Sequence, residues 1–257
     1  PAMNQQMYRA QATQHNLQTL ATRGLLLWGP DSGSQACGDV GPGRMLDPLT
    51  IVDMAAQHFA SPVKDLQHLN LMITAGPTRE PLDPVRYITN HSTGKMGYAI
   101  AENAMLRGAD VTLVTGPCAM EPPMFVKVKP VISAQDMYEA VTEEYEQTDI
   151  VIMTAAVADY RPAQVSTEKV KKKEDDMSIP LTRTKDILAT LGASKTHQFL
   201  CGFSMETQNM LENSRTKIAK KNLDMIVANN LKVAGAGFGT DTNVITLIAN
   251  DMEKELP

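Results

Sequence analysis

Short apolar runs alternate with amphipathic segments along most of the chain. From residue 69 onward, runs rich in Val and Ile predict buried strands, and the longer segments between them have helical spacing. We expect strands at Leu69–Thr74, Asp110–Thr115, Asp149–Thr154, Gln198–Phe203 and Asp224–Ala228. We expect helices at Gly94–Arg107, Ala134–Gln147, Lys185–Ala193 and Gln208–Asn222, and an edge hairpin from Asn243–Ala249 and Lys254–Leu256. This alternation predicts an α/β protein with a Rossmann-like, doubly wound, mainly parallel sheet.

The first part of the chain has a different pattern. A helix is predicted from Met3 to Thr22, a buried strand at Leu25–Trp28, a glycine-rich loop from Asp31 to Arg44 and a helix from Asp47 to Phe59. One strand cannot build a sheet, so we expect its partners upstream and treat the chain as part of a longer protein. With a linker at Ala60–Asp65, this predicts two parts, residues 1–64 and 65–257.

The segment that follows the strand Leu69–Thr74 has unusual chemistry. Pro77, Pro81 and Pro84 exclude a helix, and the next helix is expected at Gly94, capped by Ser92 or Thr93. A strand, a polar loop and a glycine-flanked helix start turn backbone N–H groups toward an anion. Gly94-Lys-Met-Gly97 is neither the dinucleotide fingerprint nor a P-loop, so the glycines alone are weak evidence.

The whole segment Ile73–Gly97, ITAGPTREPLDPVRYITNHSTGKMG, closely resembles the signature of phosphopantothenate–cysteine ligase, the synthetase half of a bacterial bifunctional enzyme of coenzyme A synthesis. The resemblance implies CTP-dependent ligation of 4′-phosphopantothenate and cysteine through an acyl-cytidylate, with release of CMP and pyrophosphate.

Two N-terminal stretches, Pro1–Tyr8 and Ala36–Met45, are similar to the last two motifs of the flavin-dependent phosphopantothenoylcysteine decarboxylase. The resemblance implies an incomplete flavodoxin-like fragment in which Asn4 holds substrate and Cys37 donates a proton. The residues that would bind FMN precede this chain, so decarboxylation is expected only in the full-length protein. As an alternative, Cys37 is an idle loop thiol here, because reactivity requires a lowered pKa in an assembled site.

Polar residues follow the predicted strands, where ligands bind in such sheets. The amide of Asn90 can donate to a carboxyl oxygen, although a loop asparagine often bonds its own backbone. The small residues from Ala155, including Ala156, bring backbone close to a ligand. Asp159 ends that turn and can hold Mg²⁺ on phosphates, with a helix or turn cap as the alternative.

Lysines supply positive charge in two places. The run Glu168–Glu174 would ordinarily be solvated surface, but its position and its match to the family's Lys-Ile-Lys-Lys run distinguish Lys169. Phe203 can offer a ring face to a base, and Lys217 and Lys221 share a helix face, which without the resemblance would be an exposed basic face. The resemblance places the nucleotide among Lys185, Asp186, Ile187, Leu188, Phe203, Lys217 and Lys221. Thr93 and Asn230 depart from the family, which has Ser and Asp there, and the second change removes a carboxylate.

A carboxylate does not acylate an amine in water unless one oxygen becomes a leaving group, and nucleotidyl transfer supplies one. Charge develops first on phosphate oxygens, which Lys169 and Mg²⁺ would stabilise, and then on the acyl oxygen, which Asn90 would orient or stabilise. No protein nucleophile is needed. The histidines outside the signature lack metal-ligand spacing.

Composition limits the alternatives. The chain has 257 residues, 43% of them hydrophobic, which is enough for a full core. It contains no apolar run long enough for a membrane span and no secretory signal, and its three separated cysteines do not suggest a disulfide framework, so we expect a cytoplasmic protein. A net charge of −5 gives no reason to expect nucleic acid.

Two other functions remain open from the residues alone. A nicotinamide-dependent oxidoreductase could use the same fold, although the first βα turn lacks G-x-G-x-x-G. A non-catalytic oligomerisation module is the second. An exposed edge strand and the family resemblance predict a homodimer through the ligase domain, and a higher homo-oligomer in the full-length chain.

Overall fold

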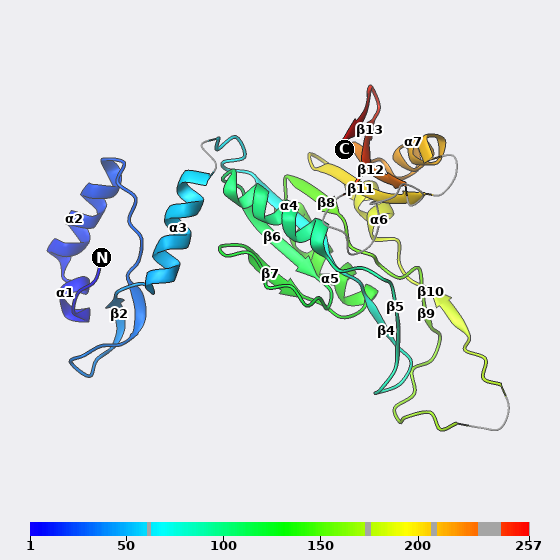
Figure 1. Ribbon diagram of the computed structural model, residues 1–257, viewed down its shortest axis with the longest axis horizontal. Coiled ribbons are helices and arrows are strands. Elements are labelled where there is room, and N and C mark those ends of the chain that lie inside the picture. The colour runs from blue at the N-terminus through cyan, green and yellow to red at the C-terminus, as the bar shows by residue number, and fades with distance from the viewer. Residues whose placement is uncertain (61–62, 173–175, 207–209, 231–242, 257) are drawn as a thin grey trace. The chain divides into compact units, whose positions relative to one another are not determined.

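The computed structural model, drawn in Figure 1, describes most of the chain. The described residues are 1–60, 63–172, 176–206, 210–230 and 243–256. The chain folds as two compact units, Pro1–Pro62 (unit 1) and Val63–Pro257 (unit 2), which are described separately. The start of the helix predicted at Gln208 and the end of the lysine run, from Lys173, lie outside the described residues.

Unit 1 combines helices with one hairpin. Its elements are α1 (Gln5–Arg9), α2 (Gln11–Thr22), α3 (Pro48–Ala60) and the antiparallel strands β1 (Asp31–Ser34) and β2 (Val40–Arg44). The single helix predicted from Met3 to Thr22 is divided at Ala10, whose backbone is extended. The expected loop at Asp31–Arg44 was wrong. Its ends pair as a hairpin that packs against the N-terminus, where a Cβ on Gly43 would lie 2.2 Å from the carbonyl oxygen of Met3.

The strand predicted at Leu25–Trp28 was also wrong. These residues have no regular secondary structure, and Leu25 and Leu26 are 51% and 59% exposed. An apolar run becomes a strand only when another strand supplies hydrogen-bond partners and a sheet face to pack on. Among the described residues of unit 1, the hairpin strands pair only with each other, so this run has neither.

Unit 2 is built on an eight-stranded sheet within the part of the chain that the structure describes. The parallel strands are β3 (Asn70–Ala75), β6 (Asp110–Thr115), β7 (Lys127–Pro130), β8 (Ile150–Met153), β11 (Phe199–Glu206) and β12 (Met225–Asn230). The antiparallel strands β13 (Ile245–Ala249) and β14 (Met252–Leu256) form the edge hairpin. The order is β14-β13-β12-β11-β8-β3-β6-β7. Numbered along the chain, the parallel strands lie in the order 3-2-1-4-5-6, which is the Rossmann order.

Helices cover both faces of this sheet (Figure 1). Alternate residues of a strand point to opposite faces. On one face Leu71 and Ile73 pack with α4 (Lys95–Leu106), and on the other Met72 packs in a cluster with α5 (Ala134–Glu144), α6 (Ile187–Ser194) and α7 (Met210–Lys221). A short 3₁₀ helix, Tyr145–Gln147, follows α5. The predicted doubly wound α/β fold is confirmed.

Two small hairpins project from the sheet and were not predicted. One joins β4 (Arg79–Pro81) to β5 (Tyr87–Thr89), and the other joins β9 (Tyr160–Pro162) to β10 (Leu181–Arg183). With the described residues between β9 and β10, 163–172 and 176–180, they form a projection that we call the arm (Figure 1). No helix among the described residues is long and apolar enough to cross a membrane.

Candidate functional site

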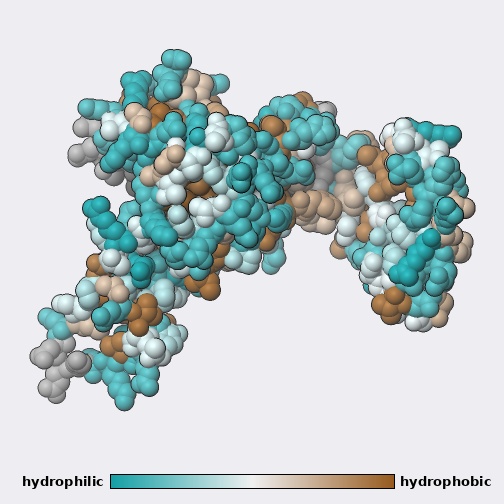
Figure 2. All heavy atoms as spheres, turned by 180° about the vertical axis from the view of Figure 1, so that it is seen from behind, coloured by the Kyte–Doolittle hydropathy of each residue, from teal (hydrophilic) through white to brown (hydrophobic). Residues whose placement is uncertain are grey.

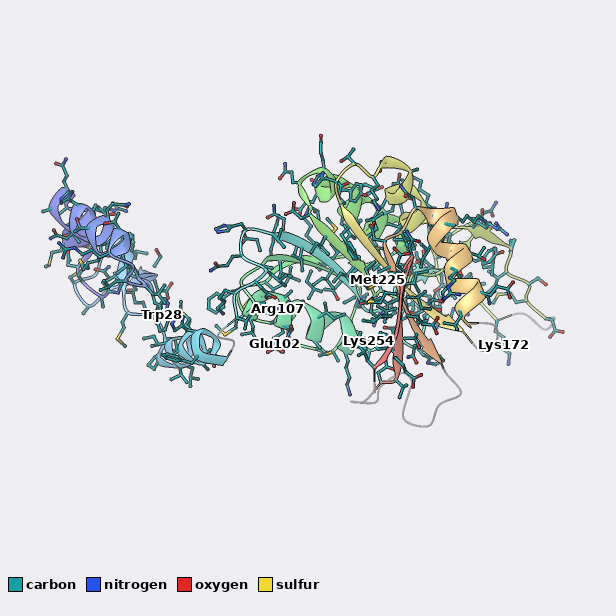
Figure 3. The ribbon with its side chains drawn as sticks, turned by 90° about the horizontal axis from the view of Figure 1, so that it is seen from above. Trp28, Glu102, Arg107, Lys172, Met225 and Lys254 are labelled. Atoms are coloured by element: carbon teal, nitrogen blue, oxygen red, sulfur yellow. The ribbon has the colours of Figure 1, made fainter. Side chains whose placement is uncertain are left out.

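A cavity of about 840 Å³ opens at the carboxyl ends of the central strands of unit 2. The strand order reverses between β3 and β8, and ligands of doubly wound proteins bind at this reversal. The cavity is lined from α4, from the turns after β6 and β8 and from the ends of β11 and β12. Its lining residues are Ser92–Ala99, Glu102, Met120, Glu121, Pro123, Thr154–Val157, Asp159, Phe203, Ser204, Lys217, Asn229 and Asn243. Figure 3 labels Glu102 on α4 and Met225 at the start of β12.

Glycines at the start of α4 let this helix approach the sheet. A Cβ on Gly97 would lie 2.6 Å from both the Ala75 Cβ and the Thr154 Oγ1 atoms, so only glycine fits there without a shift. The cap predicted at Ser92 or Thr93 was wrong. The N-cap is Gly94, in the left-handed conformation with φ 81°, and the Ser92 hydroxyl instead accepts a hydrogen bond from the Gly94 N–H at 3.3 Å.

The segment between β3 and α4, residues 76–93, which we call the signature loop, is hydrogen-bonded to the turn that follows β8. Thr78 is fully buried, and its hydroxyl accepts a hydrogen bond from the Ala158 N–H at 3.0 Å. The Ala156 N–H donates to the Gly76 carbonyl at 2.9 Å, and the Ala156 carbonyl accepts from the Thr78 N–H at 3.3 Å. These bonds join segments about eighty residues apart, so the signature loop fixes the backbone of the Ala155–Asp159 turn.

Asn90 takes part in the same network. Its Nδ2 group donates to the Ala156 carbonyl at 3.0 Å, so its amide meets the turn at one of the predicted substrate-binding residues. The side chain is exposed and does not line the described cavity. Ala155 and Ala156, in contrast, line it directly.

Asp159 lines the cavity from the end of the same turn. Its backbone carbonyl accepts from the Thr184 N–H at 3.0 Å, and its side chain is exposed. The described residues contain no group of three or more His, Cys, Asp or Glu side chains that could hold a metal ion. A single carboxylate suits Mg²⁺, which is commonly bound through one or two carboxylates together with phosphates.

Lys169 lies on the arm, exposed and outside the cavity lining, but the next residue is anchored. The Val170 N–H donates to the Asp83 carboxylate at 3.1 Å, and the Val170 carbonyl accepts from Arg86 at 2.8 Å. The Asp83 side chain is 0% exposed and also binds Arg86 directly. The Arg86 guanidinium, helped by three backbone N–H groups, holds the pKa of Asp83 well below its ordinary value. The signature loop therefore fixes the chain beside Lys169. Figure 3 labels Lys172 farther along the arm, away from the sheet.

We expect Asp83→Asn to lower the melting temperature near neutral pH. A carboxylate whose pKa is lowered by folding stabilises the protein at every pH above its unfolded value of about 3.9, and this contribution is lost as the pH falls through the lower folded value. The difference in melting temperature between wild type and Asp83→Asn should therefore be constant from about pH 7 to 5 and shrink below about pH 4. Asp65→Asn is the control, because its pair with Arg107 is half exposed and should contribute little. A difference that grows on acidification would contradict this account.

Phe203 and Lys217 both line the cavity, as expected of a nucleotide site. The ammonium of Lys217, on α7, lies 3.4 Å from the Ser204 hydroxyl at the end of β11. The ring of Phe203 and this ammonium therefore come from neighbouring elements at one end of the sheet.

The other predicted nucleotide residues do not line the described cavity. Asp186 caps α6 by accepting from the Ala189 N–H at 3.0 Å, and Lys221 binds its carboxylate at 2.8 Å. Burial opposes this charge, but Lys221 and the cap bond together lower the pKa of Asp186. The Lys185 ammonium lies 4.1 Å from the centre of the Tyr138 ring. Ile187 is buried in the core, and Leu188 packs beside the core and lies next to Gly202, so these two would meet a ligand mainly through backbone.

Unit 1 brings together the two residues that the resemblance assigned to decarboxylation. The Asn4 side-chain amide group donates to the Cys37 sulfur at 3.3 Å, and the side-chain oxygen of Asn4, Oδ1, caps α1 by accepting from the Gln6 N–H at 2.8 Å. Cys37 is exposed.

Several residues of the site were missed from the sequence. Thr78, Asp83, Ser204 and Asn229 are all buried and polar, and each meets a residue from another element of the fold, although Asp83 also binds the nearby Arg86. Burial of a polar side chain marks a structural or ligand contact, but no local pattern reveals it. The side chain of Asn230, where the family has Asp, lies outside the described part of the chain.

Comparison with known proteins gives matches for both units. Residues 66–257 match the family model described as DNA/pantothenate metabolism flavoprotein C-terminal domain, and residues 1–60 match one described as Flavoprotein. The Coenzyme A biosynthesis bifunctional protein CoaBC of Escherichia coli strain K12 is 59% identical over 261 residues. The protein of that name in Bacillus subtilis strain 168 is 49% identical over 260 residues. Each alignment covers 100% of this chain and 64% of the relative, so the chain spans less than two thirds of their length.

Solved structures share the fold. The crystal structure of the C-terminal domain of CoaBC is 49% identical, with a TM-score of 0.65, and the match covers 76% of this chain and 88% of that one. A Cab2 variant in complex with phosphopantothenate-cysteine has a TM-score of 0.62 over 82% of this chain and 88% of that one. At 15% identity the second match shows the fold alone.

Proposed function

Since the chain belongs to the family of the DNA/pantothenate metabolism flavoprotein C-terminal domain, we propose that unit 2 joins 4′-phosphopantothenate to cysteine with consumption of CTP. The products are 4′-phosphopantothenoylcysteine, CMP and pyrophosphate, and the reaction belongs to coenzyme A synthesis. The relatives that span the whole chain are named as bifunctional proteins of that synthesis, which supports the assignment.

One structural observation carries the proposal. The signature loop, the Ala155–Asp159 turn, Phe203 and Lys217 are far apart in sequence, yet they meet at the single place where this fold binds ligands. The cavity lining includes the Phe203 ring, the Lys217 ammonium group, the Asp159 carboxylate and closely approaching backbone. These groups suit a base, phosphates and a phosphate-bound cation.

The reaction proceeds in two steps. The carboxylate of phosphopantothenate attacks the α-phosphate of CTP, so that a C–O–P bond forms and pyrophosphate leaves. The amine of cysteine then attacks the acyl carbon, an amide bond forms, and CMP leaves with one of the original carboxylate oxygens. Lys169 stabilises charge on phosphate in the first step, and Asn90 orients the acyl group in the second. Lys185, Asp186 and Lys221 border the nucleotide.

Mg²⁺ fits this site through Asp159. The carboxylate ends a turn whose backbone is fixed by the signature loop, and phosphate oxygens would complete the coordination. When bound, the ion neutralises phosphate charge.

The decarboxylase half is a separate part of the proposal. Asn4 and Cys37 would hold substrate and donate a proton in the full-length protein, where FMN supplies redox chemistry. In unit 1 the side chain of Cys37 is exposed and that of Asn4 is half-exposed. We therefore assign no decarboxylation step to this chain alone.

Omission of single reactants tests the proposed function. Mass spectrometry should detect 4′-phosphopantothenoylcysteine only when CTP, phosphopantothenate and cysteine are all present. One pyrophosphate should be released for each molecule of product. A nicotinamide oxidoreductase or an oligomerisation module would release no pyrophosphate. No product in the complete mixture from a folded protein would overturn the proposal.

We expect deletion of residues 1–64 to leave ligase turnover nearly unchanged. The cavity, the signature loop and all residues assigned to ligation belong to unit 2, and the boundary between the units falls at residues 62 and 63. The measurement is steady-state pyrophosphate release by whole and truncated chains. Loss of most activity in a truncated chain that retains cooperative melting would contradict the two-domain division.

The proposed homodimer has a candidate contact on the arm. Several large apolar side chains are exposed there: Val85 (58%), Tyr87 (48%), Tyr160 (45%), Val165 (47%) and Leu181 (48%). Figure 2 shows the projection with brown apolar residues at its surface. Exposed apolar groups of this kind favour association. Light scattering should give twice the mass of one chain, and less for Val85→Lys with Leu181→Lys. A monomeric wild type would contradict the dimer.

A further inference from the structure

Asn229 is a buried polar residue whose hydrogen bonding is incomplete. It lies at the end of β12, is 5% exposed, and is opposite Met205 on β11 and Ile245 on β13. Its side-chain oxygen, Oδ1, accepts no hydrogen bond in the structure of the described residues. Buried amide oxygens are nearly always paired, because leaving one without a donor forfeits the bond it would make in water. An unpaired one beside a cavity therefore indicates a donor that arrives with a ligand.

The position of Asn229 identifies which part of a ligand it meets. Met205 is in register with Asn229, and Phe203 is two residues earlier on the same strand, so Phe203 and Asn229 point to the same face of the sheet. Both line the cavity. Asn243 also lines the cavity, and its side-chain oxygen is likewise buried and without a hydrogen-bond partner. Two amide oxygens in one cavity with an aromatic ring make a site for a flat group that carries hydrogen-bond donors.

We propose that Asn229 is a specificity-determining residue whose side-chain oxygen accepts a hydrogen bond from the nucleoside of the nucleotide substrate. This inference rests on the proposed function. Cytosine carries an exocyclic amino group that can donate, whereas uracil has a carbonyl oxygen at that position, which would face the amide oxygen without a hydrogen bond. The ribose 2′-hydroxyl is the other donor of the nucleoside. Phe203 supplies the ring that a base of either kind can stack on.

Binding to the unaltered chain tests the proposal first. Calorimetric titration with CTP, UTP and 2′-deoxy-CTP compares ligands that each lack one candidate donor: UTP has no exocyclic amino group and carries an N3–H in place of the N3 acceptor, and 2′-deoxy-CTP has no 2′-hydroxyl. A site built to pair a donor rejects the analogue that lacks it, so the dissociation constant for UTP or for 2′-deoxy-CTP should exceed that for CTP by about tenfold or more. Weaker UTP binding identifies the amino group, and weaker 2′-deoxy-CTP binding identifies the hydroxyl. Equal affinity for all three overturns the proposal and indicates that the oxygen is satisfied by water.

The variant Asn229→Leu tests whether this side chain is responsible. Leucine has the same branched shape and number of side-chain heavy atoms but no acceptor, so the preference for CTP should fall to within about twofold of equal binding, while a phosphate-only probe, inorganic triphosphate, binds as before. Ser214→Ala is the matched control, because Ser214 has a buried unpaired hydroxyl but does not line the cavity. Its preference should match wild type. An Asn229→Leu protein that keeps the full preference overturns the proposal.

The outcomes separate this inference from the function on which it rests. Absence of binding by any nucleotide to wild type overturns both. Binding without discrimination overturns only the role of Asn229. If Asn229→Leu does not melt cooperatively, the three titrations of wild type and those of Asn243→Leu test the role of Asn229 instead. An unchanged preference for CTP in a folded Asn243→Leu protein identifies Asn229 as the acceptor. Equal affinity of wild type for the three nucleotides excludes Asn229 as the acceptor.

Discussion

Lys169→Gln is expected to slow formation of the acyl-cytidylate by about 100-fold or more. Glutamine is polar and one atom shorter than lysine, but it has no positive charge to stabilise the phosphate oxygens as pyrophosphate departs. Although Lys169 is exposed, the adjacent Val170 is held through both its N–H and its carbonyl, by Asp83 and Arg86. A charge on an anchored backbone needs less rearrangement to act on the phosphates than one on a free loop.

Single-turnover release of pyrophosphate, with CTP and phosphopantothenate but without cysteine, measures this step. Lys172→Gln is the matched control, because Lys172 belongs to the same charged run and has no assigned role. An unchanged burst in Lys169→Gln would mean that Lys169 is only a solvated surface residue.

Asn90→Asp is expected to separate the two half-reactions. The Asn90 amide donates to the Ala156 carbonyl, and a carboxylate cannot make this bond. The substitution also places an anion near the acyl oxygen, where negative charge develops during attack by cysteine. Phe203, Lys217 and Lys169 are unchanged, so the nucleotide site is retained. The second half-reaction should therefore fall far more than the first.

The expected observation is one pyrophosphate per site on mixing Asn90→Asp with CTP and phosphopantothenate. An acyl-cytidylate should be detectable by mass after quenching, and little product should form when cysteine is added. Equal loss of both half-reactions would make Asn90 a positioning or folding residue, and thermal melting distinguishes those two. Normal turnover would remove Asn90 from the site.

The central sheet was predictable because its strands are apolar runs between amphipathic helices. Asp110–Thr115 was predicted with the same bounds that the structure has, and the family was predicted correctly from Ile73–Gly97. β7 was missed because its sequence, Lys-Val-Lys-Pro, is too short and polar to signal a strand, although pairing with β6 forms it. Tertiary pairing, not propensity, decides such edge strands.

The site was predictable only in part, for a similar reason. A motif places Asn90, Asp159 and Lys217 by type and spacing, but it does not reveal what each residue bonds to. The anchoring of Val170 depends on Asp83, 87 residues earlier. The burial of the Asn229 side chain depends on its position between β11 and β13. Contacts at this separation follow from the assembled fold.

Transfer of a labelled carboxylate oxygen tests the central claim most directly. Phosphopantothenate with oxygen-18 at both carboxylate oxygens is turned over with CTP and cysteine, and the masses of the products are measured by mass spectrometry. Attack on the α-phosphate followed by aminolysis predicts that CMP carries one labelled oxygen and that pyrophosphate carries none. Label in inorganic phosphate, or unlabelled CMP with the lost carboxylate oxygen released into water, would contradict an acyl-cytidylate at this site.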